Sequence, residues 1–345
     1  MKTTRISRRK FIGSTAIASG MASFAPFGIA YGPSLKEQTG NRSAGEVWIA
    51  GISQMWLRSE TAERMVDEIL NLLKDVESFQ PDFVCLPEVF PFAMTQKKYR
   101  MNEMIEISEK VIDLFSGFSR RNKCYTVCPV YITNEGKNYN SAVFIDRQGG
   151  KIGLYNKIHP TIEEIDGGVY PGDIQQQPVQ TEFGPVGAQI CFDINWDDGW
   201  TMLQKQGTKI VFWPSAFAGG KMVNTKAWEH KYIVASSSNQ NDSKLCDITG
   251  ETIAQTGIWN KYLYCGRVNM EKAFIHLWPY VERFREIQNK YGRKVSISIY
   301  HEEQWAIIES KSPDISVKDI LKEFEILTHE EHIDKGEAAQ KKARG

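Results

Sequence analysis

After residue 45, segments with short apolar runs alternate along the chain with segments whose apolar residues lie three and four positions apart. This pattern predicts a layered α/β domain. Short apolar runs bounded by Gly, Pro or Asn predict strands, whereas apolar residues three and four apart predict helices. Helices are predicted over about 61–76, 103–120 and 224–232, with strands between them. Several consecutive strands are joined by predicted hairpins, of which the last covers about 245–256. Helices interleaved with hairpins favour a mixed sheet over a purely parallel one.

The N-terminal segment has the pattern of an export signal. Residues 1–30 carry five basic residues and no acid, followed by a moderately apolar stretch that ends in a small-x-small cleavage pattern, Gly28 and Ala30. The segment Ser7–Ile12 resembles the twin-arginine export motif. We therefore expect a twin-arginine signal peptide, a periplasmic destination and a linker over 31–45. The alternative is a basic segment before an anchor helix, but no other apolar stretch reaches the length of a membrane span, so no stable anchor is expected after cleavage.

Composition and charge narrow the possible functions. The 345 residues are 41% hydrophobic, which supplies a core and excludes intrinsic disorder. Lys plus Arg and Asp plus Glu both number 42, so the chain lacks the net basic charge of a nucleic-acid-binding protein. The phosphate-binding loop, the dinucleotide fingerprint and the zinc motif H-E-x-x-H are missing from the sequence, so neither a cofactor nor a metal is expected. From about 311 to 345 the mixed charges predict a solvated helical tail.

Three chemically active residues stand at or just past the ends of apolar strands. Glu88 follows F-V-C-L-P, Lys157 follows G-L-Y-N, and Cys191 follows P-V-G-A-Q-I. In α/β sheets, ligands bind at the carboxyl ends of strands, so these side chains can converge on one site. A thiol needs a base or a cation to become a good nucleophile, and a carboxylate with an ammonium supplies both. Each residue alone also fits a turn, a surface ion pair or core filling.

These residues and their surroundings resemble a known family. The segments L-P-E, Y-N-K-I-H-P-T and I-C-F-D are similar to the Glu-Lys-Cys signature of the carbon–nitrogen hydrolases, the nitrilase superfamily. The resemblance implies a four-layer αββα sandwich, which we expect over residues 46–310. It also implies acyl transfer from nitrogen to water through a thioester, and a homodimer or a higher homo-oligomer.

The resemblance assigns roles to individual residues. Cys191 matches the nucleophile, Glu88 the general base and Lys157 the cation that stabilises the oxyanion. The backbone N–H of Phe192 is the expected second oxyanion donor. The family places a second glutamate after the lysine, and the spacing P-T-x-x-E selects Glu164. Glu163 remains the alternative to Glu164.

Three further residues are candidates for the substrate pocket. His159, Asp193 and Trp213 lie near the motifs in sequence. Alternatively, His159 is a hydrogen-bonded loop residue, Asp193 caps or orients the turn after the nucleophile, and Trp213 packs in the core.

The residues that follow Cys191 indicate the class of substrate. The chain reads C-F-D, which is similar to amidases and carbamoyl hydrolases, whereas nitrilases usually read C-W-E. A small amide is therefore the expected substrate and partner, cleaved to a carboxylate and ammonia or an amine. The alternatives are a ureido substrate, a nitrile, acyl transfer to an amine, and a binding module without catalysis.

Overall fold

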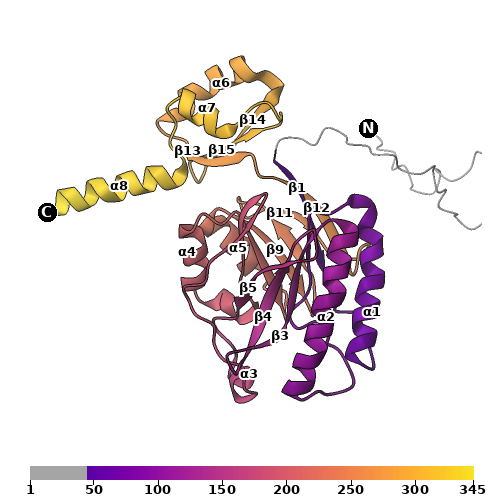
Figure 1. Ribbon diagram of the computed structural model, residues 1–345. Helices are drawn as coiled ribbons and strands as arrows, with labels where there is room; N and C mark the ends of the chain where they lie inside the picture. Colours follow the sequence, from indigo (N-terminus) through magenta and orange to yellow (C-terminus); the bar gives the residue numbers. More distant parts are fainter. Residues whose placement is uncertain (1–44) are drawn as a thin grey trace, which may run out of the picture. The chain divides into compact units, whose positions relative to one another are not determined.

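Two six-stranded mixed sheets form the body of the protein. Figure 1 shows the computed structural model, which describes residues 45–345. The first sheet contains, in spatial order, β12 (Leu263–Asn269), β1 (Glu46–Ile52), β2 (Phe83–Cys85), β3 (Tyr125–Asn134), β4 (Lys137–Ile145) and β5 (Lys151–Asn156). The second contains β11 (Thr252–Gln255), β10 (Lys244–Cys246), β9 (Ile233–Ser238), β8 (Ile210–Ser215), β7 (Gly184–Ala188) and β6 (Val179–Thr181). The predicted signal peptide and all but the last residue of the predicted linker lie outside the described residues.

Each sheet combines parallel strands in the middle with antiparallel strands at its edges. In the first sheet β1, β2 and β3 are parallel, whereas β12, β4 and β5 pair in the antiparallel sense. In the second sheet β7, β8 and β9 are parallel, and β6, β10 and β11 are antiparallel. The predicted mixed sheet is therefore confirmed.

Alternation along the strands separates the apolar side chains into layers. Successive strand residues face opposite sides of a sheet. In β1, Ile49 faces the central core between the two sheets, where it joins Phe212 of β8. Ile52 faces the other way and packs in a second cluster with Met65 and Phe115, which come from helices. Each sheet thus has one face against the other sheet and one face against helices.

Helices cover the two outer faces. The helices α1 (Ala62–Leu73) and α2 (Met101–Asn122) cover the first sheet, and α4 (Asp198–Lys205) and α5 (Lys221–His230) cover the second (Figure 1). The apolar spacing sets this arrangement: α1 buries Met65, Ile69 and Leu73. The order helices, sheet, sheet, helices is the predicted four-layer αββα sandwich, which is confirmed.

The last predicted hairpin is not the end of the sheet structure, so that prediction was wrong. β12 returns to pair with β1, and a three-stranded antiparallel sheet follows. This small sheet contains β13 (Lys272–His276), β15 (Trp305–Ser310) and β14 (Val295–Tyr300). The segment that forms β12 has Gly266 at its centre and Arg267 beside it, which interrupts the apolar run that would predict a strand. The predicted domain boundary at 310 stays a prediction.

Helices of the C-terminal segment pack on the small sheet. The helices are α6 (Arg283–Tyr291), α7 (Val317–Glu323) and α8 (His329–Arg344). In the predicted solvated tail, α8 has no buried residue, whereas α7 buries Val317 and Ile320 in an apolar cluster with Ile287 of α6. Only α8 thus has the expected solvated character.

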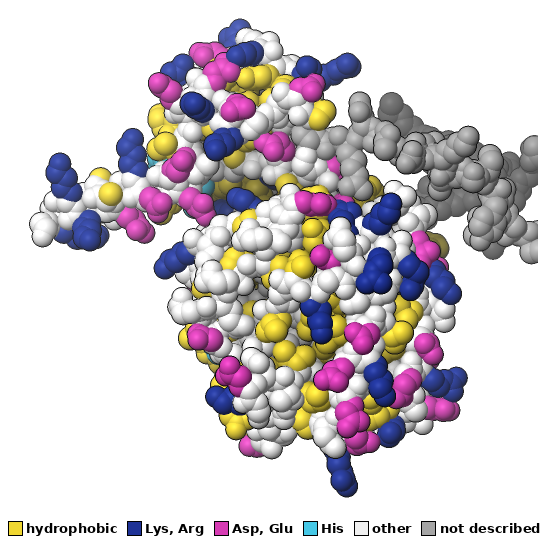
Figure 2. Space-filling model, viewed as in Figure 1, with side chains coloured by type: hydrophobic (Ala, Val, Ile, Leu, Met, Phe, Trp, Pro, Cys, Tyr) yellow, Lys and Arg dark blue, Asp and Glu magenta, His cyan; other side chains and the backbone are white. Residues whose placement is uncertain are grey.

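Charges of both signs are interspersed on the visible face of the protein (Figure 2), which agrees with the net charge of zero. No helix within residues 45–345 combines the length and the apolar character that crossing a membrane requires.

Candidate functional site

Strand ends of both sheets bring the three predicted residues together. Glu88 lies three residues after β2, and Lys157 directly follows β5, so both come from the first sheet. Cys191 lies three residues after β7 of the second sheet, where it begins a short 3₁₀ helix, η2 (Cys191–Asn195). All three side chains are buried, with exposed fractions of 3%, 1% and 7% for Glu88, Lys157 and Cys191. The charges of Glu88 and Lys157 both act on the Cys191 thiol, so the expected convergence at the strand ends is present.

Lys157 joins two carboxylates. Its Nζ lies 2.8 Å from Oε1 of Glu88 and 2.6 Å from Oε2 of Glu164. Glu164 belongs to the short helix α3 (Ile162–Asp166), which begins after Thr161. Glu163 precedes it on the same helix and is exposed. Of the two candidate glutamates, Glu164 is therefore the one that contacts Lys157.

Asn140 belongs to the same cluster, although the sequence analysis did not single it out. Its side chain is 1% exposed, and its Nδ2 donates to Oε1 of Glu88 and to Oε1 of Glu164, both at 2.8 Å. The available signal was a polar residue just before the apolar run S-A-V-F-I of β4. That signal alone does not reveal its partners, because Glu88 lies 52 residues away in sequence.

The cluster holds the thiol of Cys191 in its protonated form. Burial and the negative charge of Glu88 raise the pKa of Cys191 to about 12, although Lys157 acts in the opposite direction. Burial disfavours the charged form of Lys157, but Glu88, Cys191 and Glu164 outweigh burial and raise its pKa. At neutral pH the site therefore contains a neutral thiol beside an ammonium, and a thiol of this kind becomes nucleophilic only when a base takes its proton.

The backbone at Cys191 has an unusual conformation. Its φ angle is +47°, which lies in the left-handed region that only glycine adopts without strain. Trp213 stabilises the turn at Cys191, because its Nε1 donates a hydrogen bond to the Cys191 carbonyl oxygen at 3.1 Å. Trp213 itself is fully buried. Its indole therefore packs in the core against the backbone of Cys191.

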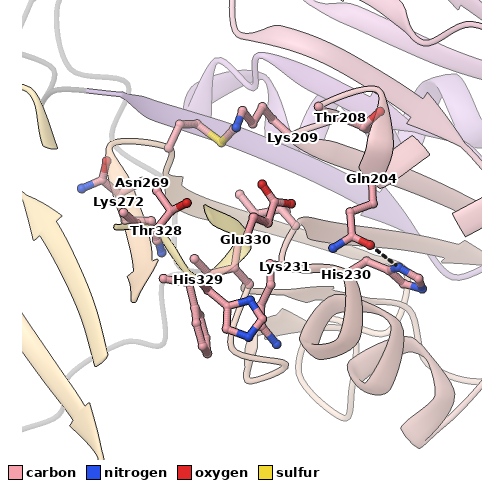
Figure 3. A pocket seen from close by; sticks show the side chains of 16 residues that line it. Gln204, Thr208, Lys209, His230, Lys231, Asn269, Lys272, Thr328, His329 and Glu330 are labelled. Atoms are coloured by element: carbon pink, nitrogen blue, oxygen red, sulfur yellow. Dashed lines mark hydrogen bonds between the residues drawn. The ribbon is translucent and has the colours of Figure 1, made fainter. Parts of the chain in front are cut away.

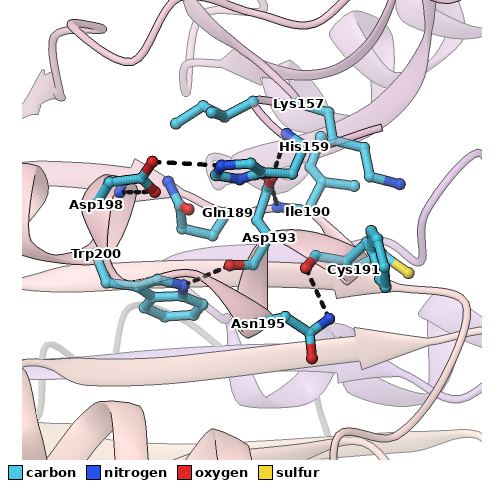
Figure 4. Close-up of polar contacts among 12 residues, drawn as sticks. Lys157, His159, Gln189, Ile190, Cys191, Asp193, Asn195, Asp198 and Trp200 are labelled. Atoms are coloured by element: carbon cyan, nitrogen blue, oxygen red, sulfur yellow. Dashed lines mark hydrogen bonds and ion pairs between the residues drawn. The ribbon is translucent and has the colours of Figure 1, made fainter. Parts of the chain in front are cut away.

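Asp193 ties this turn to the segment that carries Lys157 (Figure 4). Its carboxylate is fully buried and accepts from Ile190 N at 2.7 Å, Tyr155 Oη at 2.8 Å and His159 N at 2.7 Å. Two of these partners flank Lys157 in sequence. The structure therefore gives Asp193 the orienting role that the sequence left as its alternative.

His159 is held between protein groups. Its ring stacks on Trp196 at a centroid distance of 4.3 Å, Nδ1 lies 3.1 Å from Asp193, and Nε2 lies 3.3 Å from Asp198. Burial disfavours the imidazolium, but Asp193 and Asp198 outweigh burial and raise the pKa of His159. Phe192, whose side chain is 37% exposed, packs edge-on against the same Trp196. Both ring nitrogens of His159 thus face carboxylates of the protein.

Two features lie on other elements. Asp197, Glu229 and His230 place their donor atoms within 4.8 Å of one another, a spacing that could hold a metal ion. Lys226 competes for this place, because its Nζ lies 2.7 Å from Oδ1 of Asp197. A cavity of about 170 Å³ beside His230 is lined by residues of α4, α5, β13 and α8 and by Lys231, which directly follows α5 (Figure 3). The expectation that no metal or cofactor is needed stays a prediction.

Comparisons with known proteins agree with this fold. The model of the carbon–nitrogen hydrolase family matches residues 49–273. The Drosophila melanogaster "nitrilase and fragile histidine triad fusion protein" is 26% identical over 178 residues, which are 48% of this chain and 38% of that protein. The Oryza sativa subsp. japonica N-carbamoylputrescine amidase is 28% identical over 170 residues, 46% of this chain and 52% of that protein. The chain thus matches about half or less of the length of these relatives.

A solved structure supports the same fold. It is a variant of the amidase from Nesterenkonia sp. AN1, in which the acetamide moiety of fluoroacetamide is covalently attached to the active-site cysteine. The TM-score is 0.57 at 16% identity, over 72% of this chain and 98% of that chain.

Proposed function

Because the chain belongs to the carbon–nitrogen hydrolase family, we propose that it hydrolyses a small amide to a carboxylate and ammonia or an amine. The bond cleaved is a carbon–nitrogen bond other than a peptide bond, and the intermediate is a thioester on Cys191. One observation carries the proposal: a buried thiol, a buried carboxylate and a buried ammonium converge from strand ends of two sheets.

Acylation begins with proton transfer from the thiol. The carboxylate of Glu88 takes the proton from Sγ of Cys191 while Sγ attacks the carbonyl carbon of the amide. The S–H bond breaks, the S–C bond forms, and the carbonyl oxygen becomes an oxyanion. Glu88 then gives the proton to the leaving nitrogen as the C–N bond breaks. The products of this half-reaction are a thioester and free ammonia or amine.

The oxyanion needs donors that are in place before the reaction. The ammonium of Lys157 is held at the site by Glu88 and Glu164, and the backbone N–H of Phe192 follows the nucleophile directly. A fixed cation in a buried site stabilises developing negative charge more strongly than it would in water. We assign both donors to the oxyanion.

Deacylation repeats the proton transfers with water. Glu88 takes a proton from water as the water oxygen attacks the thioester carbon, and the S–C bond then breaks. The proton returns to Sγ of Cys191, which restores the thiol, and the product leaves as a carboxylic acid that ionises to the carboxylate in water. The covalent acetamide adduct on the cysteine of the Nesterenkonia amidase supports a thiol nucleophile at this kind of site.

The second candidate is a ureido substrate. One relative is named N-carbamoylputrescine amidase, and the same three residues would attack a carbamoyl carbon in the same way. Hydrolysis of a nitrile, acyl transfer to an amine and binding without catalysis are the remaining alternatives.

Release of ammonia or amine from a panel of substrates tests these alternatives. The full chain is incubated with aliphatic amides, aryl amides, ureido acids and nitriles, beside Cys191→Ala and the matched control Cys265→Ala. We expect release from amides that disappears in Cys191→Ala and persists in Cys265→Ala, whose thiol lies on β12. Release of ammonia or amine from ureido acids alone, or from nitriles alone, would show that the substrate belongs to that class and is not an amide. If no substrate releases ammonia or amine and Cys191 is as inert to alkylation as the other thiols, binding without catalysis is the remaining alternative.

We also propose export through the twin-arginine pathway and assembly into at least a homodimer. The basic pair at positions 8 and 9 supports export, and the family resemblance supports the dimer. Fractionation of cells that produce the chain with Arg8→Lys and Arg9→Lys, with Arg5→Lys as control, tests export. Light scattering of the purified chain at two concentrations tests the dimer.

A further inference from the structure

Asn140 lies between the two glutamates of the site. Its Nδ2 is 2.8 Å from Glu88 Oε1 and 2.8 Å from Glu164 Oε1. An amide nitrogen carries two hydrogens, so each carboxylate receives one. The reverse orientation of the amide would place Oδ1 against two carboxylates. The surrounding charges therefore fix the orientation of the Asn140 side chain.

The hydrogen bonds to Glu88 are distributed unevenly between its two oxygens. Oε1 accepts from both Lys157 Nζ and Asn140 Nδ2. Oε2 is buried and accepts no hydrogen bond from any group within residues 45–345. Buried oxygens usually have a partner, so an open one in a cluster of this kind is available for a proton.

We propose that Asn140 is a positioning residue that makes Oε2 of Glu88 the oxygen that takes the proton of the Cys191 thiol, an inference that rests on the proposed function. By donating to Oε1 together with Lys157, Asn140 fixes the rotation of the carboxylate. The two hydrogen bonds also lower the proton affinity of Oε1 relative to Oε2. Transfer breaks the S–H bond and forms the O–H bond on Oε2.

Asn140 also offsets an imbalance of charge. Two carboxylates share the single ammonium of Lys157, and a neutral amide donates to both without adding charge. The other titratable groups that face Glu88 are the thiol of Cys191 and the phenol of Tyr131, whose pKa is raised by burial and by both carboxylates. Loss of the amide would remove one of the two hydrogen bonds to Glu88 Oε1, and such hydrogen bonds favour the charged form of a carboxylate.

The alkylation rate of Cys191 by iodoacetamide between pH 5 and 9 tests the proposal. The variants are Asn140→Leu and Asn140→Asp, and the control is Asn138→Asp on the same strand, where Asn138 bonds Thr133 outside the cluster. For Asn140→Leu we expect the plateau of the Cys191 alkylation rate to be at least tenfold lower. We also expect the rise of this rate at the acid end of the profile to move to higher pH by half a unit or more. For Asn140→Asp, which can donate only while it is protonated, we expect the rate to fall as pH rises from 5 to 7, opposite to the control.

A purely structural role gives a different result. Profiles of both variants that coincide with the control, or that fall uniformly at every pH together with a lower Tm, would overturn the proposal. Circular dichroism at each pH identifies folded samples. If Asn140→Leu does not fold, Asn140→Asp decides the question, because it keeps the size of the side chain.

Alkylation needs no substrate, so this test is separate from the test of hydrolysis. If amides are hydrolysed, we expect Asn140→Leu to lower kcat at least tenfold with KM within twofold, and an unchanged kcat would contradict the proposal. If no substrate in the panel reacts and Cys191 is as inert to alkylation as the other thiols, the hydrolase proposal fails. If no substrate reacts but Cys191 is alkylated faster than the other thiols, the alkylation profiles still decide whether Asn140 directs the thiol proton to Glu88.

Discussion

At the scale of single residues, the carboxylate of Asp193 holds the site together although it does not reach the thiol. It accepts hydrogen bonds from segments of both sheets: from Ile190, which precedes Cys191, and from Tyr155 and His159, which lie on either side of Lys157 in sequence. Cys191 has a left-handed backbone, a conformation that costs about 1–3 kcal/mol and persists only when its surroundings enforce it. Asp193 is part of what enforces it.

Asp193→Asn should therefore lower both stability and thiol reactivity. The amide would turn an NH₂ group toward donors that now find an oxygen, and a disrupted buried polar network costs about 3 kcal/mol. Urea unfolding measures this loss, and iodoacetamide measures the reactivity of Cys191. The control Asp113→Asn changes an exposed residue of α2 and should stay within about 0.5 kcal/mol of the parent. A fully stable Asp193→Asn would refute the role given to this carboxylate.

His159 should make stability depend on pH in one direction. Asp193 and Asp198 raise its pKa in the folded protein above the value of about 6.5 for an unperturbed histidine. The stabilisation is fully present below the unfolded pKa and is lost as pH rises through the folded pKa. The difference in unfolding free energy between the parent and His159→Gln should thus shrink as pH rises from 6 to 8. NMR titration of His159 gives its pKa directly, and a value below 6.5 would contradict this expectation.

At the scale of elements, the five-residue helix α3 connects helix capping with the candidate chemistry. Thr161 Oγ1 accepts from Glu164 N at 3.3 Å, and Glu164 Oε2 accepts from Thr161 N at 2.8 Å. The same Oε2 lies 2.6 Å from Lys157 Nζ. A capping box normally serves only to start a helix. Here it also fixes the carboxylate that holds the ammonium.

Thr161→Val should affect activity more than stability. Loss of an N-cap costs about 1 kcal/mol, and α3 has no buried residue that would spread the damage. Thr328→Val removes the same kind of cap from α8 and serves as a matched control. We expect similar small shifts in Tm for the two variants, with lower amide hydrolysis only for Thr161→Val. Equal activities would show that the cap does not position Glu164.

At the scale of the whole molecule, the family match ends at residue 273, and the segment after it has its own apolar cluster. Phe284 and Ile287 of α6 and Ile320 of α7 pack there with β13 and β15. This segment contributes none of the side chains that converge at Cys191. Its last helix, α8, buries no residue.

Deletion of residues 333–345 should leave both the Tm and the activity unchanged. Ile320→Asp should behave differently, because a charge buried without a partner within the cluster costs several kcal/mol. Calorimetry of the two variants beside the parent makes the comparison. A large drop in Tm on deletion would mean that α8 is covered by a partner, for which the expected dimer is the first candidate to examine.

The sequence could predict the residues whose signal is local. Each of the residues Glu88, Lys157 and Cys191 follows an apolar strand. Their convergence at the carboxyl ends of the strands could therefore be inferred before any contact was known. Asn140 could not be assigned, because its two partners lie 52 and 24 residues away and no spacing encodes such contacts. β12 and the small sheet were missed because strand propensity depends strongly on the neighbouring strand.

The pairing of β1 with β12 has a consequence for biosynthesis. β1 ends at Ile52, and its partner strand begins at Leu263, so the first sheet stays incomplete until nearly all of the sandwich has been synthesised. Until then the backbone of β1 has an open edge beside apolar side chains, and such edges recruit other chains. A ribosome that stops before residue 263 would therefore release a chain prone to aggregation rather than a weakly active fragment.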